Sequence, residues 1–329
     1  GEPVGEGWHA EFGDRHAEAV ALAGAGERAR GATLVVTLEP CAHVGNQPPC
    51  IDAILAAGVR RVVAAMPDPN PVARGGAVRL RQAGIDVELG LRAAEACAQN
   101  AAFVHRMLDQ RRPFVALKLA TTLDGRIADH TGRSRWISGP GAREYVHWLR
   151  AGFDAIAVGG ATARTDDPSL TVRGAVTPRV APVRVVFDRR AGIPAGLVLV
   201  RTAADLPTMV VAAADAPLDA VRRLEAAGVT VHRAADLAEG LERLRAAGVG
   251  SVLVEGGGRL AGALLAAGLV DRLYLIQAPR WLGEAGIPAF AGLPAVELDR
   301  APRWTVVERR ALGDDTLLVV DRTPCSQAS

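Results

Sequence analysis

The chain has 329 residues, 49% of them hydrophobic, a length and composition that favour two globular domains with apolar cores. Its 38 basic and 36 acidic residues are mixed along the sequence and leave a net charge of +2, which argues against a nucleic-acid partner. No apolar run reaches the roughly 20 residues that cross a bilayer and no secretory signal is seen, so we expect a cytoplasmic protein without a membrane partner.

The first third of the chain alternates apolar runs with stretches of helical spacing. We expect strands at 4–9, 33–38, 59–65 and 85–89. Helices are expected at 49–57, 73–83 and 93–108. Strands that alternate with helices of this length indicate a mostly parallel α/β sheet. The basic and proline-containing run Arg111-Arg112-Pro113 then predicts a domain boundary.

A second α/β series follows this boundary. Strands are expected at 114–120, 155–159, 183–187, 197–201, 208–212, 229–232 and 251–254. Helical patterns occupy 218–227 and 237–247. The final strands, at 273–278, 304–310 and 316–321, have no helices between them, which predicts an antiparallel edge on a mixed sheet.

A set of possible metal ligands lies in the first series. His16 and Glu18 begin a helical stretch, Cys41 follows the strand at 33–38, and Cys50 stands nine residues later at a helix start. One imidazole and two thiolates would hold a zinc ion and leave its fourth position open for water. A carboxylate two residues from the histidine could carry the proton of that water to departing ammonia. The pattern therefore predicts a zinc-dependent deaminase.

Less specific interpretations exist for the same residues. A His-x-Glu sequence is common by chance, and two buried cysteines can be free thiols. A closed structural zinc site would need a fourth ligand, for which His43 is the nearby candidate. The combination of His-x-Glu, a Pro-Cys after a strand and a second cysteine opening a helix favours the catalytic interpretation.

In the second series, Lys118 is the only lysine of the chain. Either chance left it there, or the position needs an amine that can give up a proton, which arginine cannot supply. The glycines at 256–258 join a strand to a helix, where a backbone could approach a phosphate, or simply form a tight turn. Arg150 and Arg173 could clamp a phosphate or form surface ion pairs. Trp136 could lie against a cofactor ring or in the core.

The run Glu39-Pro40-Cys41-Ala42-His43, with the later Pro48-Pro49-Cys50, resembles the deaminase half of the bifunctional riboflavin-biosynthesis deaminase/reductase family. Asp68-Pro69-Asn70-Pro71 matches the same family. The resemblance implies a cytidine-deaminase-like three-layer domain acting on 2,5-diamino-6-ribosylamino-4(3H)-pyrimidinone 5′-phosphate. It also implies that three residues contact the substrate, namely His43, Asp68 and Asn70.

Two features depart from the family pattern. Members begin with a helix and a strand that carry an Asn-Pro motif, so we expect that this helix and first strand are absent from the sequence. Members also have a basic residue where Asn46 stands. One phosphate or substrate contact is therefore expected to be weaker.

Segments from Pro113 to Asp321 resemble, in the same order, the reductase half of that family, a dihydrofolate-reductase-like α/β domain that uses NADPH. By this resemblance the cofactor is held by Ala120, Trp136, Thr162, Asp166, Gly257, Gly258 and Gly262. The substrate is held by Ser134, Arg150, Leu170, Arg173 and Glu255. Lys118 also falls on the family pattern, and either it or Asp166 is expected to be the polar catalytic group near the reacting carbon.

The sequence thus predicts a zinc-dependent deaminase domain at 1–110 and an NADPH-dependent reductase domain at 113–322. Together they would remove an amine from the pyrimidinone and then reduce the ribosyl group to a ribityl chain. In an alternative, only the reductase works and the first domain is a structural zinc and oligomerisation module. Deamination of a nucleic-acid base fits the low charge and the 4% aromatic content poorly. We expect a homo-oligomer whose partners are small molecules.

Overall fold

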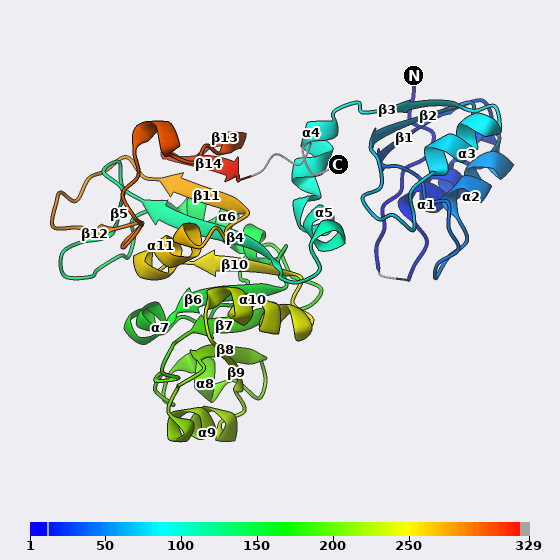
Figure 1. Ribbon diagram of the computed structural model, residues 1–329. Helices are drawn as coiled ribbons and strands as arrows, with labels where there is room; N and C mark the ends of the chain where they lie inside the picture. Colours follow the sequence, from blue (N-terminus) through cyan, green and yellow to red (C-terminus); the bar gives the residue numbers. More distant parts are fainter. Residues whose placement is uncertain (12, 323–329) are drawn as a thin grey trace. The chain divides into compact units, whose positions relative to one another are not determined.

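The computed structural model describes residues 1–11 and 13–322, which divide into two compact units (Figure 1). The first unit contains Gly1–Leu108 and the second begins at Asp109. No helix within the described residues is long and apolar enough to cross a membrane.

The first unit is built on a small parallel sheet with the strand order β1-β2-β3. Its strands are β1 (Thr33–Leu38), β2 (Arg61–Met66) and β3 (Asp86–Leu89). Its helices are α1 (Ala17–Ala25), the 3₁₀ turn η1 (Gly26–Ala29), α2 (Cys50–Ala57), α3 (Gly76–Gln82), α4 (Ala93–Gln99) and α5 (Ala101–Leu108). Parallel strands joined by helices confirm the predicted α/β class.

Two apolar clusters hold this unit together. Ile51 and Ile54 of α2, Val62 of β2 and Leu80 of α3 are fully buried in the first cluster. The second contains Met66 of β2 together with residues of α4 and α5. The helix predicted at 93–108 is interrupted at Asn100, whose side-chain amide donates to the Ala96 carbonyl, 2.7 Å away, and competes with helix continuation.

The prediction of a strand at 4–9 is wrong, because this segment has no strand assignment. Its backbone instead lies against α1: a Cβ atom on Gly7 would come within 2.2 Å of the Ala17 carbonyl oxygen. Arg28 also donates to the Val4 carbonyl, 3.0 Å away. The segment therefore packs on a helix, and within residues 1–11 and 13–108 no strand pairs with the outer edge of β1.

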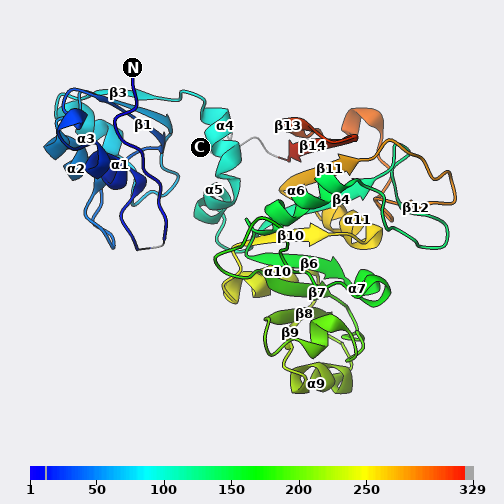
Figure 2. The same cartoon turned by 180° about the vertical axis from the view of Figure 1, so that it is seen from behind.

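The second unit contains a nine-stranded mixed sheet in the order β13-β14-β11-β4-β10-β6-β7-β8-β9 (Figure 2). Its strands are β4 (Phe114–Thr121), β6 (Ala155–Gly159), β7 (Val183–Phe187), β8 (Thr208–Ala213), β9 (Thr230–Ala234), β10 (Ser251–Glu255), β11 (Arg272–Gln277), β13 (Thr305–Leu312) and β14 (Asp315–Asp321). A separate pair is formed by β5 (Arg126–Ala128) and β12 (Ile287–Pro288). The antiparallel pairing of β14 with both β11 and β13 confirms the predicted edge.

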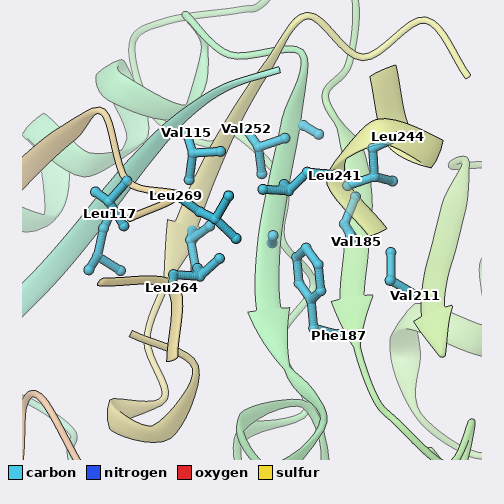
Figure 3. Packing of buried hydrophobic residues seen from close by; sticks show 14 of the residues in the cluster. Val115, Leu117, Val185, Phe187, Val211, Leu241, Leu244, Val252, Leu264 and Leu269 are labelled. Atoms are coloured by element: carbon cyan, nitrogen blue, oxygen red, sulfur yellow. The ribbon is translucent and has the colours of Figure 1, made fainter. Parts of the chain in front are cut away.

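Helices cover both faces of this sheet. They are α6 (Pro140–Arg150), α7 (Gly160–Asp166), α8 (Val198–Arg201), α9 (Leu218–Ala226), α10 (Leu237–Ala246) and α11 (Gly258–Ala266). The unit also contains the 3₁₀ turn η2 (Leu298–Arg300), which buries no residue. Leu241 of α10 and Leu264 of α11 pack against β4, β10 and β7 in one core (Figure 3). Leu199 of α8 and Leu224 of α9 belong to a second core. Side chains alternate between these faces along each strand.

The strand predicted at 197–201 is wrong, because residues 198–201 form the short helix α8. A brief apolar run does not distinguish a strand from a buried helical turn. The tertiary structure decides: the buried Arg184 on β7 donates to the carbonyl groups of Leu199 and Thr202 at 3.2 and 3.1 Å. A helical turn presents these carbonyls together to one guanidinium.

Candidate active sites

The structure brings the three predicted metal ligands together in the first unit. The ligand atoms of His16, Cys41 and Cys50 all lie within 4.8 Å of one another. His16 Nδ1 is 3.2 Å from Cys50 Sγ and 3.5 Å from Cys41 Sγ. Both cysteines are buried and His16 is half-buried, so two thiols and one imidazole converge on one point.

Local structure places each of these ligands. His16 is the residue that precedes α1, and Cys50 is the first residue of α2. Cys41 follows β1 by a short loop, and its sulfur accepts a hydrogen bond from the backbone N–H of Cys50, 3.4 Å away. The hydrogen bond from the Cys50 thiol lowers the pKa of Cys41 to about 5, although burial opposes the shift. Hydrogen-bond donors at the start of a helix stabilise a thiolate.

The donor set fits a zinc ion. One imidazole and two thiols are typical zinc ligands, and three protein ligands leave a position for water. Glu18, two residues beyond His16, lies in the first turn of α1. Burial raises the pKa of the Glu18 carboxyl, and hydrogen bonds from its own backbone and from Cys50 oppose that rise only in part. A raised pKa makes a carboxylate a stronger base, which suits it to accept a proton and pass it on.

The buried carboxylate of Glu39 supports this site and was not predicted as a functional residue. Its two oxygens accept hydrogen bonds from the backbone N–H groups of Gly75, Ala77 and Asp68 at 3.2, 2.8 and 3.2 Å. Glu39 therefore joins the end of β1 to the start of α3 and to the turn after β2. An acidic residue directly before the Pro-Cys sequence at the end of a predicted strand was the available signal.

The residues expected to contact the deaminase substrate lie on loops of the same unit. Asp68 is buried, its Oδ1 accepts from the Asn70 N–H at 2.8 Å, and burial raises its pKa. Asn70 Oδ1 in turn accepts from the Val72 N–H at 3.1 Å. The Nδ1 atom of His43 is buried and has no hydrogen-bond partner among the described residues, so a polar ligand could satisfy it. His9 was not singled out from the sequence, and its ring lies edge-on to that of His16 with centroids 5.4 Å apart.

A second polar cluster occupies the sheet of the other unit. Glu255 on β10 and Lys118 on β4 are partners in the strand register. Because Leu117 and Leu119 point into the core shared with α10 and α11, Lys118 points to the opposite face. There its Nζ lies 3.9 Å from Glu255 Oε2, and Arg150 of α6 approaches Glu255 with Nε–Oε1 at 2.5 Å.

The charged groups in this cluster shift one another's pKa values. Burial lowers the pKa of the Lys118 ammonium, and attraction to Glu255 only partly opposes this shift. For Glu255, burial alone would raise the pKa, but the positive charges of Arg150 and Lys118 reverse the effect and lower it. The site thus holds a lysine whose proton is released more easily than usual, beside a carboxylate that stays ionised.

The loop after α7 is held next to this cluster. Leu170 is buried with a left-handed φ of 49°, a strained conformation for a leucine. Arg150 Nη1 donates to the Thr171 carbonyl at 2.8 Å, and the backbone N–H of Arg173 donates to His147 Nδ1 at 3.1 Å. The Arg173 side chain is exposed and has no ion pair within residues 1–11 and 13–322. Of the two predicted clamp residues, Arg150 is thus paired with a carboxylate and Arg173 is open to a ligand.

The glycines of the predicted cofactor turn have different neighbours. Gly257 has φ 85°, and a Cβ atom there would lie 3.1 Å from Thr162 Oγ1, so the β10–α11 turn lies beside α7. A Cβ atom on Gly258 would lie 2.4 Å from the Pro288 carbonyl oxygen, and one on Gly262 would lie 2.3 Å from that of Ala291. These last two glycines are therefore also required for close packing of α11 against the segment around β12.

The remaining predicted cofactor and substrate residues lie on β4 and on neighbouring loops. Ala120 is two residues beyond Lys118 on β4 and Ser134 follows β5. Trp136 is 62% exposed, which excludes the core alternative, and the Arg143 guanidinium lies 4.8 Å from its ring centroid. Asp166 ends α7, and its carbonyl accepts from Arg135 Nη2 at 2.7 Å.

Comparison with known proteins gives matches over both units. The family model of the RibD C-terminal domain matches residues 113–318, and that of the cytidine and deoxycytidylate deaminase zinc-binding region matches residues 1–66. The riboflavin biosynthesis protein RibD of Escherichia coli (strain K12) is 42% identical, covering 97% of the chain and 89% of that protein. The solved structure of Acinetobacter baumannii RibD in form 1 is 36% identical, with a TM-score of 0.80 over 97% of the chain and 88% of that structure. A Thermotoga maritima structure titled diaminohydroxyphosphoribosylaminopyrimidine deaminase/5-amino-6-(5-phosphoribosylamino)uracil reductase is 33% identical, with the same TM-score and coverages.

Proposed function

Because the chain belongs to the RibD family of riboflavin-biosynthesis proteins, we propose that residues 1–110 form its deaminase domain and residues 113–322 its reductase domain. The protein is a bifunctional enzyme whose cofactors are zinc and NADPH. The alternative of a structural N-terminal module is not favoured, because bifunctional relatives match both units.

We infer the substrates from the name of the Thermotoga maritima relative. The deaminase would act on the 5′-phosphate of 2,5-diamino-6-ribosylamino-4(3H)-pyrimidinone. Water replaces the amino group and ammonia leaves. The reductase would then convert the ribosyl group of the deaminated product to a ribityl chain, taking a hydride from NADPH.

In the deaminase domain, His16, Cys41 and Cys50 would hold the zinc ion. Bound zinc lowers the pKa of a water molecule to near neutrality. Glu18 would take a proton from that water and pass it to the leaving amine, a role that its raised pKa and its place beside Cys50 support. Substrate contacts are proposed for His43, Asp68 and Asn70. The buried, unpartnered Nδ1 of His43 is the observation that favours such a contact.

In the reductase domain, the bound NADPH supplies the hydride and the chain supplies orientation and a proton. We assign the cofactor to Ala120, Trp136, Thr162, Asp166, Gly257, Gly258 and Gly262. We assign the substrate to Ser134, Arg150, Leu170, Arg173 and Glu255. Lys118 would donate the proton that accompanies hydride transfer, because burial lowers the pKa of its ammonium and makes it a stronger acid, and Glu255 lies 3.9 Å from it.

The convergence of His16, Cys41 and Cys50 beside Glu18 carries the deaminase assignment, and one coupled assay tests the whole proposal. Purified protein is incubated with the diaminopyrimidinone phosphate while ammonia release and NADPH oxidation are followed separately. Removal of zinc with a chelator should abolish ammonia release, and added zinc should restore it. NADPH oxidation with the already deaminated substrate should continue after chelation. Ammonia release that persists without zinc contradicts the metal site.

We also propose that the protein is a cytoplasmic homo-oligomer that binds small molecules and neither nucleic acid nor membranes. Large apolar side chains on the segment between β11 and β13 are exposed, including Trp281, Val296 and Leu298, which favours a subunit contact. Light scattering at several protein concentrations tests this. A monomer at all concentrations contradicts the oligomer.

A further inference from the structure

His147 is a half-buried histidine beside the reductase cluster to which no role has so far been assigned. It lies on α6, one helical turn before Arg150, so both side chains emerge from the same face of that helix. His147 Nδ1 accepts from the backbone N–H of Arg173, and Arg150 Nη1 donates to the carbonyl of Thr171. Two hydrogen bonds therefore attach the loop that carries the Arg173 side chain to one face of α6.

From this geometry we propose that His147 is a positioning residue, which holds the Arg173 loop through Nδ1 so that the Arg173 guanidinium meets the phosphate of the reductase substrate. The proposal rests on the assignment of Arg173 to substrate binding made above. It requires neutral His147 with its proton on Nε2, because a protonated Nδ1 cannot accept a hydrogen bond.

The surrounding charges favour this neutral form. The charged groups that face His147 are Arg150 from its own helix, Arg173 from the loop, Lys118 from β4 and Glu255 from β10. Three cations and one carboxylate leave a positive field. Burial, followed by repulsion from Arg150 and Arg173, lowers the pKa of His147, and Glu255 opposes the shift only in part. At neutral pH the ring therefore keeps its acceptor without adding charge.

Two substitutions separate the acceptor from the rest of the ring. Asn Oδ1 is bonded to Cγ, as His Nδ1 is, so His147→Asn can still accept from the Arg173 N–H, whereas His147→Leu cannot. Loss of one hydrogen bond predicts that His147→Leu raises the KM for the ribosyl-phosphate substrate roughly three- to tenfold. The KM for NADPH and kcat should change less than twofold, and His147→Asn should restore most of the substrate KM. Equal KM values for the asparagine and leucine variants would overturn the proposal.

A pH profile provides a test that does not depend on the leucine variant folding. As pH falls through the pKa of His147, below its ordinary value of 6.5, the wild type should lose kcat/KM for the phosphate substrate. The substrate phosphate also titrates near pH 6, but it does so equally for every variant. His147→Asn should therefore show a shallower acid limb than the wild type. Superimposable limbs would contradict the role of His147.

Arg173→Ala distinguishes failure of this inference from failure of the proposed function. If Arg173→Ala leaves the substrate KM unchanged, the phosphate assignment itself is wrong. If it raises the KM but His147→Leu does not, only the positioning role fails. If His147 acts through Arg173, the double variant should have nearly the KM of Arg173→Ala alone, because effects along one path do not add. Independent, multiplying effects would show that His147 acts by another route.

Discussion

The two sites of the molecule differ in how far apart their residues lie in the sequence. The proposed metal ligands of the first unit come from one short stretch, with Cys50 standing 34 positions after His16. In the second unit, 105 residues separate Arg150 from Glu255, and β4, β10 and α6 must all be in place before the cluster exists. A local site depends on its loops and helix ends, whereas a distributed site depends on sheet register and packing.

The two sites also differ in how charge is controlled. In the first unit a helix start and a neighbouring thiol favour the Cys41 thiolate. In the second unit the pKa values of a buried lysine and a carboxylate depend on each other and on an arginine, and the three groups come from two strands and a helix. Chemistry at the first site should respond to single ligand changes, and chemistry at the second should respond to changes in any element that sets the register.

The largest expected effect is a loss of ammonia release at the local site of the first unit. Glu18→Gln removes the proposed proton carrier while keeping the size of the side chain, so ammonia release should fall by about 10²- to 10⁴-fold. Zinc content measured by mass spectrometry should stay at the wild-type level. NADPH oxidation with deaminated substrate should also stay unchanged, because Glu18 belongs to the first unit. Loss of zinc together with activity would show that Glu18 supports the metal and not the proton transfer.

At the distributed site, Lys118→Arg keeps the charge but replaces an amine that can lose its proton with a guanidinium that cannot. NADPH oxidation should fall about 10²-fold or more, while ammonia release is retained. Since Lys118 is the only lysine, a ¹⁵N-lysine label gives one side-chain NMR signal that reports its pKa directly. A pKa at or above the ordinary value of 10.5, or an active arginine variant, would contradict the proton-donor role.

Packing of the second unit can be tested at Gly262. A Cβ atom there would lie 2.3 Å from the Ala291 carbonyl oxygen, so Gly262→Ala should lower the free energy of unfolding of the second unit by about 1–3 kcal/mol. Gly196→Ala is the control for a methyl group added in open space, because nothing lies within 4 Å of a Cβ atom at that glycine. Denaturant unfolding measures both variants. Equal stability would mean that the segment around Ala291 moves aside without cost.

The smallest effect concerns the pH dependence of stability. The pKa of Glu255 is lowered in the folded protein, so its ionised form stabilises the second unit above the ordinary pKa of 4.5. This stabilisation is lost as pH falls through the folded pKa. The free energy of unfolding of Glu255→Gln should therefore vary less between pH 5 and pH 3 than that of the wild type. Parallel pH profiles would show that the ion pairs of Glu255 contribute no net stability.

Much of the architecture could be read from the residues. Alternating apolar runs and helical spacing predicted the parallel strands of both units and the antiparallel edge formed by β11, β13 and β14. The errors have identifiable causes. Residues 4–9 look like a strand but pack on α1 through glycines, and residues 197–201 are apolar enough for a strand but form α8 around the buried Arg184. Periodicity cannot reveal contacts made with distant elements.

The proposed metal ligands, with Glu18 between them, could be predicted from the sequence alone, because residue type and short spacing are typical of a zinc site and the helix starts bring the three side chains together. Lys118 was conspicuous as a single lysine in the sequence, but its role could not be deduced from the sequence. Strand register aligned it with Glu255, and the packing of α6 added Arg150 and His147. Only the tertiary structure could decide this, because the pKa of a buried charge depends on neighbours that are remote in the chain.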